Sequence, residues 1–178
     1  ALIMAATYII AEIAQAHDGS LGILMSLIEA AARCGVDAVK FQLHLADFES
    51  SNCEPFRVNF SYEDSCRFDY WKRMEFSFDQ WVMIKSKCHE EGVDFLATPF
   101  SLSAVDLLEK LDVTSYKIGS GDFTNKLLID YILMHKKPMY LSCGMATYDE
   151  ILYVVNYLQA REASFSLFQC TTNYPTLP

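Results

Sequence analysis

The sequence contains no apolar run long enough to cross a bilayer. Its most apolar stretch, residues 1–13, is interrupted by Thr7 and Glu12 and is shorter than the ~18–20 residues that a membrane-spanning helix needs. The stretch also lacks the basic n-region of a signal peptide. We therefore expect a cytoplasmic protein that does not associate with membranes.

Cysteine pairs at the Cys-x-x-Cys spacing of metal and redox sites are also missing. The six cysteines stand singly in mostly apolar segments, at Cys34, Cys53, Cys66, Cys88, Cys143 and Cys170. Scattered cysteines of this kind favour buried, reduced thiols in a cytosolic protein over a disulfide framework.

Positive charge is scarce. There are 14 Lys and Arg residues against 23 Asp and Glu, so the formal net charge is −9. This balance argues against a broad surface for nucleic acid or anionic lipid, but a few lysines in a cleft can still bind an anionic substrate. Hydrophobic residues make up 52% of the 178 residues, which excludes a disordered chain and predicts one sizeable core.

What the sequence does contain is an alternation of short apolar runs and amphipathic segments. Strands are predicted at 8–12, 38–42, 95–98, 115–118, 139–142 and 165–169. Their nearly continuous apolar character is typical of parallel strands covered by helices. Helices are predicted between them at 21–34, 81–91, 103–111, 125–134 and 151–158, several with Ser or Thr at the start.

Residues 43–76 interrupt this rhythm with a polar and aromatic segment. A loop of that length inside a compact α/β domain is usually functional. We expect it to shape substrate specificity.

Two architectures fit the pattern, an open doubly wound sheet and part of a (β/α)8 TIM-type barrel. The dinucleotide-binding Gly-x-Gly-x-x-Gly motif is absent, because Gly119 and Gly121 are not followed by a third glycine. Polar residues at the strand ends favour the barrel, which typically needs about 250 residues. We therefore expect residues 1–178 to be a partial barrel of about six βα units.

The strand ends carry the residues that could perform chemistry. These are Glu12, Lys40, Gln42, Thr98, Lys117, Ser120, Ser142, Thr171, Thr172 and Tyr174. Two ammonium groups, several hydroxyls and glycine-flanked amides would suit an anion that carries phosphate and carboxylate, and a carboxylate can hold a sugar hydroxyl or move a proton. The simpler alternative for each lysine is a solvated strand end. His17 is either a metal ligand or, more commonly, a loop histidine bonded to backbone.

Several segments, in order, resemble the N-acetylneuraminate (sialic acid) synthase family. They are YIIAEI at 8–13 with HDGSL at 17–21, DAVKFQ at 37–42, ATPFS at 97–101, YKIGSGD at 116–122, LSCGM at 141–145 and QCTTNYPT at 169–176. The resemblance covers essentially the whole chain and implies the N-terminal catalytic barrel. It also implies that the last strands and a C-terminal antifreeze-like domain lie outside this sequence.

The resemblance implies a condensation of phosphoenolpyruvate with an N-acetylmannosamine-like aldose, giving a sialic-acid-type nonulosonate and phosphate. Glu12 would be catalytic. Phosphoenolpyruvate would be bound by Lys40, Thr98, Lys117, Ser120, Ser142 and Thr172, and the N-acetylated hexosamine by Gln42, Asp122 and Tyr174. A divalent metal, Mn²⁺ or Mg²⁺, would take its ligands from histidines beyond Pro178. The full-length protein is expected to be a homodimer, and this fragment alone is expected to be inactive.

Two other functions fit the residues. A class I aldolase would use Lys117 or Lys40 as a Schiff-base lysine, since desolvation can depress a lysine pKa enough for that role. A non-catalytic barrel fragment would expose open sheet edges and tend to self-associate.

Overall fold

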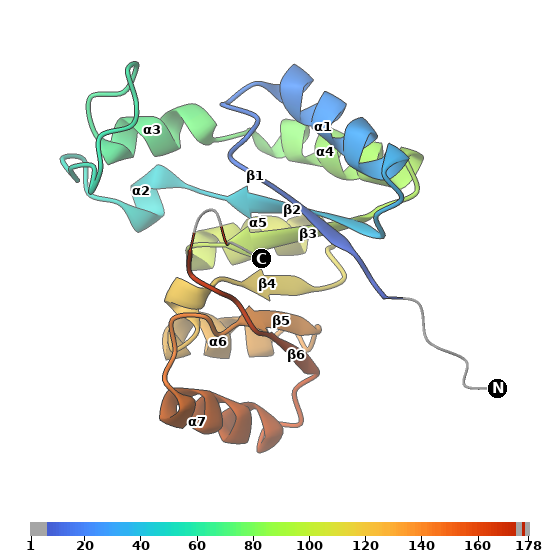
Figure 1. The fold of residues 1–178 in the computed structure, drawn as a ribbon, viewed down its shortest axis with the longest axis vertical. Helices are drawn as coiled ribbons and strands as arrows, with labels where there is room; N and C mark the ends of the chain where they lie inside the picture. The colour runs from blue at the N-terminus through green and yellow to red at the C-terminus, as the bar shows by residue number, and fades with distance from the viewer. Residues whose placement is uncertain (1–6, 174–175, 177–178) are drawn as a thin grey trace. The chain divides into compact units, whose positions relative to one another are not determined.

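The computed structural model describes residues 7–173 and 176 of this α/β chain. The chain forms two compact units, Ala1–Leu111 and Asp112–Pro178. Within the described residues, each unit contains a parallel three-stranded sheet, drawn as arrows in Figure 1. Tyr174, one of the predicted sugar-binding residues, lies outside the described part.

The first sheet has the order β1-β2-β3, formed by β1 (Ile10–Ala14), β2 (Ala38–Leu43) and β3 (Asp94–Pro99). Helices α1 (Leu21–Arg33) and α4 (Phe78–Glu90) connect these strands and pack against each other (Figure 1). Helix α5 (Leu102–Lys110) follows β3. The ring of Phe41 packs against Trp81 of α4 and Phe95 of β3, so the aromatic core of this unit lies between the sheet and α4.

The second sheet has the order β4-β5-β6, formed by β4 (Tyr116–Ile118), β5 (Met139–Ser142) and β6 (Phe165–Phe168). A single 3₁₀ turn, η1 (Ser120–Asp122), follows β4 and leads to α6 (Lys126–Leu133), while α7 (Tyr148–Gln159) connects β5 and β6. Fully buried side chains of the strands and helices form its core, among them Tyr116, Ile118, Leu141, Ile132 and Leu158.

The alternation predicted from the sequence is confirmed, with shifts at several element ends. Capping boxes form at Ser77, before α4, and at Thr147, before α7. The predicted start of α5 at Ser103 is wrong, because the side chain of Ser101 accepts the hydrogen bond from the backbone N–H of Ala104. The first strand begins at Ile10 rather than at residue 8 because its pairing with β2 begins at Ala38.

The expectation of buried thiols holds for one cysteine only. All six cysteines are free, but Cys34 and Cys53 are exposed and only Cys88 is buried. Burial raises the pKa of the Cys88 thiol to about 12, which keeps this thiol protonated. Isolated cysteines in apolar sequence are therefore a weak indicator of burial in this chain.

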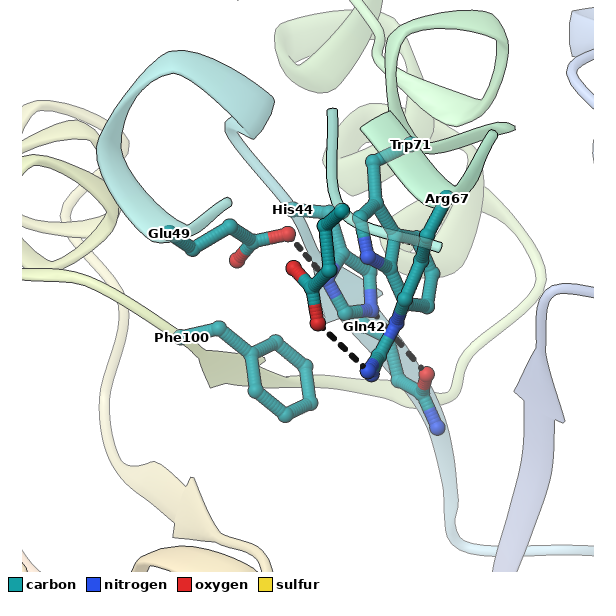
Figure 2. Close-up of a pocket in the computed structure, with 7 residues that line it drawn as sticks. Gln42, His44, Glu49, Arg67, Trp71 and Phe100 are labelled. Carbon is teal, nitrogen blue, oxygen red and sulfur yellow. Dashed lines mark hydrogen bonds and ion pairs between the residues drawn. The ribbon is translucent and has the colours of Figure 1, made fainter. Parts of the chain in front are cut away.

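The segment 43–76 is not a continuous loop, contrary to the sequence-based expectation. It contains the single-turn helix α2 (Ala46–Glu49) and the helix α3 (Arg67–Met74). The ring of His44, just after β2, is stacked between Trp71 of α3 and Phe100, with centroid separations of 3.7 Å and 4.1 Å (Figure 2). This stack attaches α3 to the ends of β2 and β3.

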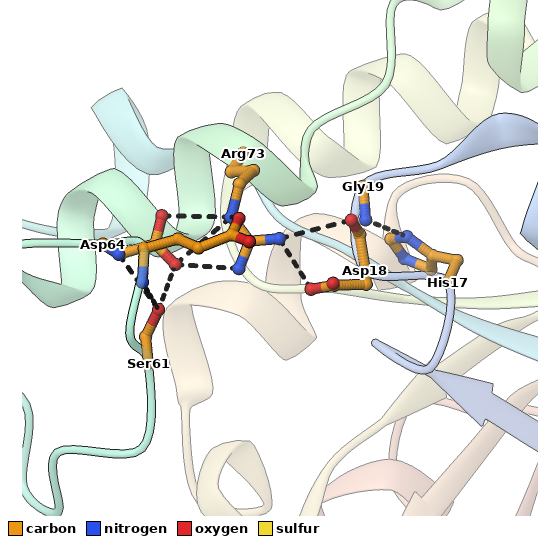
Figure 3. A network of polar contacts seen from close by, with 7 residues as sticks. His17, Asp18, Gly19, Ser61, Asp64 and Arg73 are labelled. Carbon is orange, nitrogen blue, oxygen red and sulfur yellow. Dashed lines mark hydrogen bonds and ion pairs between the residues drawn. The ribbon is translucent and has the colours of Figure 1, made fainter.

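A network around Arg73, near the C-terminal end of α3, attaches this helix to the loop after β1 (Figure 3). The Arg73 guanidinium pairs with Asp64 at 2.8 Å and with Asp18 at 2.6 Å. Ser61 also donates to Asp64, and these bonds, chiefly that from Arg73, lower the pKa of the Asp64 carboxyl. The loop between β1 and α1 is therefore fixed by a residue more than fifty positions away in sequence.

Inside that loop, His17 is a backbone-bonded histidine rather than an exposed one. It is 2% exposed, and its Nδ1 accepts a hydrogen bond from the Gly19 N–H at 3.0 Å. Burial lowers the pKa of His17 to about 4, with a smaller opposing effect of Asp18. Of the two alternatives, the structure supports the loop histidine bonded to backbone.

None of the helices in the described part of the chain is long and apolar enough to cross a membrane.

Gly19 provides a test of the loop. Its φ is +76°, and a Cβ added there would lie 2.4 Å from the backbone oxygen of Arg73. We expect Gly19→Ala to destabilise the protein by about 2–4 kcal/mol, since left-handed strain and overpacking add. Gly35→Ala is the matched control, because Gly35 has φ +78° but nothing within 4 Å of the added atom, so it should lose only about 1 kcal/mol. Urea denaturation followed by circular dichroism measures both, and equal losses would contradict the close approach to Arg73.

His17 provides a second test. Because its pKa is lowered in the folded state from 6.5 to about 4, the unfolded chain binds the additional proton between these pH values. Stability is therefore expected to fall as the pH drops from 6.5 towards 4 and to be unaffected by this group above pH 6.5. Replacing His17 by Asn, which keeps an acceptor for Gly19, should reduce the loss of folding stability between pH 7.5 and pH 5. Urea denaturation at the two pH values measures this loss. His89→Asn, at an exposed position of α4, serves as control, and a His17→Asn profile identical to wild type would refute the assignment.

Candidate functional site

In the first unit, three of the predicted residues meet around Lys40. The Lys40 ammonium group lies 2.6 Å from Oε2 of Glu12 on β1 and donates to the Thr98 hydroxyl on β3 at 3.2 Å. Lys40 is 9% exposed and Thr98 2%. A buried ammonium needs acceptors of this kind to replace its hydration, so the alternative of a solvated strand end does not describe Lys40.

The backbone of β1 is irregular beside Glu12. The pairing of β1 with β2 shifts register between Glu12 and Ala14, and Ala14 has a φ of +49°. Bulges of this type bend a strand and redirect a side chain near functional sites. The Glu12 side chain is 44% exposed, so its carboxylate both pairs with Lys40 and faces solvent.

In the second unit, Lys117 is equally enclosed. Its ammonium group donates to the Ser142 hydroxyl at 2.5 Å and to the Ile118 carbonyl at 2.8 Å, and it lies 5.6 Å from the centre of the Phe168 ring. Lys117 and Ser142 are 5% and 6% exposed. The structure therefore joins these two predicted residues directly.

Ser120 is held by the backbone at the end of β5. Its hydroxyl accepts a hydrogen bond from the Gly144 N–H at 3.3 Å. A Cβ at residue 144 would lie 2.7 Å from the carbonyl oxygen of Cys170, so only glycine permits this close approach of the segments that follow β5 and β6.

Two other predicted residues of this unit lie apart from these contacts. Asp122 accepts a hydrogen bond from the Asn125 amide at 3.0 Å, and Asn125 caps α6. Thr172 is exposed, beyond the end of β6. The predicted roles of Asp122 in sugar binding and of Thr172 in phosphoenolpyruvate binding stay predictions.

Gln42, the remaining predicted sugar-binding residue, lines a pocket of about 340 Å³ in the first unit (Figure 2). The other lining residues are His44, Glu49, Glu54, Arg67, Trp71 and Phe100. Arg67 pairs with Glu54 at 3.0 Å and its guanidinium lies 5.5 Å from the centre of the Trp71 ring. Polar groups beside an aromatic face are suited to a small polar ligand such as a sugar.

Of the seven residues that line this pocket, sequence reasoning named only Gln42 as a site residue; His44 and Glu49 are two of those it missed. His44 shows no ligand spacing along the sequence, and Glu49 is one of many acidic residues. In the structure, His44 Nδ1 lies 2.7 Å from Glu49 Oε1, and Nε2 lies 3.2 Å from Gln42 Oε1. The one available signal was that His44 stands two positions after Gln42, which places both on the same side of an extended chain.

Residues 27–178 match the family model described as the NeuB family. The chain is 34% identical over 185 residues to N,N'-diacetyllegionaminic acid synthase of Campylobacter jejuni, covering 97% of this chain and 53% of that protein. It is 31% identical over 174 residues to N-acetylneuraminate-9-phosphate synthase of Mus musculus, covering 96% of this chain and 48% of that protein. The chain thus spans about half the length of these curated relatives.

The fold is similar to that of a solved N-acetylneuraminic acid (sialic acid) synthetase from Leptospira borgpetersenii, crystallised with citrate. The TM-score is 0.81 at 24% identity, covering 97% of this chain and 57% of that one. At this identity the likeness supports the fold, and the family assignment rests on the sequence match. Because the family model covers most of the sequence, from residue 27 to its end, this chain belongs to the NeuB family.

Proposed function

We propose that the protein containing this chain condenses phosphoenolpyruvate with an N-acetylated hexosamine to give a sialic-acid-type nonulosonate and phosphate. The observation that carries the proposal is the pair of buried lysines, each hydrogen-bonded to a hydroxyl group, in a member of the NeuB family. Relatives named for legionaminic and N-acetylneuraminate-9-phosphate synthesis support this reaction class. We also propose that the fold is the N-terminal part of a (β/α)8 barrel. The full-length protein is proposed to be a cytoplasmic homodimer.

In this proposal, the lysines compensate the charges of phosphoenolpyruvate. Each sheet presents an ammonium group beside a hydroxyl group. These are Lys40 with Thr98 in the first sheet and Lys117 with Ser142 in the second. Fixed donors of this type hold an anion and stabilise charge that develops on phosphate as its bond to carbon 2 breaks. Ser120 and Thr172 would add hydroxyl groups to the same substrate.

The proposed chemistry has two bond-forming steps. Carbon 3 of the enolpyruvate attacks the aldehyde carbon of the open-chain sugar, whose oxygen takes up a proton. Water then adds at carbon 2 and phosphate leaves. The partly exposed Glu12 carboxylate, held beside Lys40 at 2.6 Å, is suited to move a proton at the sugar's reacting centre. Gln42, Asp122 and Tyr174 are proposed to bind the sugar.

A divalent ion is expected from the resemblance and would act as a Lewis acid at the aldehyde oxygen. Residues 7–173 and 176 contain no group of three His, Cys, Asp or Glu side chains that could hold a metal ion. No ligand is therefore assigned within these residues, and the metal requirement is a separate arm of the assay, run with and without Mn²⁺.

The class I aldolase is the second candidate. Its support is the burial of Lys40 and Lys117, since a Schiff-base lysine is activated by desolvation. Membership of the NeuB family favours the synthase. Borohydride trapping with a keto substrate separates them, because only the aldolase would leave a covalent adduct on lysine.

Lys117→Met is the test of the anion-binding role. In the full-length protein, phosphate release from phosphoenolpyruvate with a panel of N-acetylated hexosamines and Mn²⁺ should fall by about 100-fold or more, because one preorganised charged donor is lost. Lys110→Met, at an exposed position at the end of α5, should leave the rate unchanged, and circular dichroism checks that both variants fold.

Two results would count against the proposal. One is a wild-type protein that releases no phosphate with any hexosamine in the panel. The other is a Lys117→Met variant as active as the Lys110→Met control.

A further inference from the structure

We propose that Cys143 and Cys170 form a reversible disulfide beside the residues assigned to phosphoenolpyruvate, and that this disulfide slows the condensation. The formation of the bond needs only the geometry of the second unit. Its effect on the reaction rests on the proposed function. Both thiols are free in the structure.

The two thiols lie at the same backbone carbonyl. Strands β5 and β6 are neighbours in the sheet (Figure 1), and Cys143 directly follows β5 while Cys170 comes shortly after β6. Cys143 Sγ lies 3.3 Å from the carbonyl oxygen of Phe168, and Cys170 Sγ lies 3.5 Å from the same atom. The separation of the two sulfurs therefore cannot exceed the sum of these distances.

The Phe168 carbonyl has more donors than it can satisfy. It also accepts a hydrogen bond from the backbone N–H of Cys143 at 3.0 Å, so three donors compete for two lone pairs. Because a thiol is a weak donor, turning either thiol away from this oxygen costs little. Both cysteines are partly exposed, which gives a small oxidant access to them.

Hydrogen peroxide is the oxidant in this proposal. The sulfur of one cysteine, as the thiolate, attacks a peroxide oxygen, the O–O bond breaks, and a sulfenic acid and water are formed. The sulfur of the second cysteine then attacks the sulfenic sulfur, so the S–S bond forms and the hydroxyl group leaves as water. The sulfurs together give up two electrons to the peroxide. A dithiol reverses the oxidation by thiol–disulfide exchange.

The backbone leaves little room between the segments that carry the two cysteines. A Cβ added at Gly144 would lie 2.8 Å from Cys170 Cβ and 2.7 Å from the Cys170 carbonyl oxygen. The sulfurs of a disulfide are only about 2.05 Å apart, so forming the bond draws them together. Because the backbones already touch at Gly144, this movement has to twist one segment against the other.

A twist of the segment after β5 would disturb groups assigned to phosphoenolpyruvate. Ser142 directly precedes Cys143, and its hydroxyl accepts from Lys117 at 2.5 Å. The N–H of Gly144 donates to the Ser120 hydroxyl at 3.3 Å. Small displacements of positioned groups lower reaction rates strongly. The disulfide form is therefore expected to release phosphate more slowly than the reduced protein.

The experiment treats the full-length protein with hydrogen peroxide, blocks the remaining thiols and maps the disulfides by mass spectrometry of a tryptic digest. Arg161 is the only Lys or Arg between the two cysteines in the sequence, so cleavage there leaves them in separate peptides. We expect these peptides to stay linked until dithiothreitol is added. Phosphate release should fall about tenfold or more on oxidation and recover with dithiothreitol.

Cys170→Ser separates the disulfide from other effects of peroxide. Serine keeps a donor for the Phe168 carbonyl but cannot form the bond, so this variant should keep its rate of phosphate release after peroxide treatment. Cys34→Ser is the matched control, since Cys34 is an exposed cysteine at the end of α1 in the first unit. It should lose activity on oxidation as the wild type does, and circular dichroism checks that both variants fold.

The absence of the linked peptides, or oxidation of a single cysteine without an S–S bond, overturns the inference. Linked peptides with an unchanged rate of phosphate release overturn the effect on the reaction. A wild type that releases no phosphate before oxidation contradicts the proposed function instead, and the peptide map then decides the disulfide by itself.

Discussion

A buried ammonium group needs acceptors at fixed places, and this constraint organises both sheets. Lys40 has them because β1 and β3 flank β2 in parallel register, with Glu12 directly opposite Lys40. Lys117 has them because β5 lies beside β4 and brings Ser142 to its ammonium. Removing an acceptor would leave a buried ammonium group without compensation, which is costly. The strand register and the polar groups are thus mutually dependent.

In the segment between β2 and α4, ring stacking and ion pairs help to fix the chain. The segment after β2 is polar, yet its helix α3 is attached by the stack of Trp71 on His44 and by the ion pairs of Arg73. The Arg73 side chain is 28% exposed and Asp64 6%, so solvent screens their pairing incompletely. The segment that lines the Gln42 pocket is therefore held by interactions that do not appear as periodic hydrophobicity in the sequence.

Elements defined by apolar runs could be predicted from the sequence, whereas elements held by ring stacking and ion pairs could not. The strand Met139–Ser142 was predicted with its observed bounds because an apolar run between turn residues defines it. The burial of Lys40 and Lys117 could be anticipated from their place in apolar strands, but their partners depend on which strands are neighbours. Helix α3 was missed because stacking and ion pairs stabilise it. The contact of His44 with Glu49 was missed because it depends on how α2 folds back.

Strand β2 shows why the candidate groups belong together. Val39, Phe41 and Leu43 are at most 1% exposed, and the residues that alternate with them are Lys40, Gln42 and His44. Alternation places these three polar side chains in a row, and a register slip of one residue would replace all of them by apolar ones. The register is fixed at the start of the strand, where the side chain of Asp37 accepts from the Ile9 N–H at 2.7 Å and its carbonyl accepts from the Asp94 N–H at 2.8 Å. One aspartate at the opposite end of the sheet thereby aligns the proposed anion-binding lysine, the proposed sugar-binding glutamine and His44.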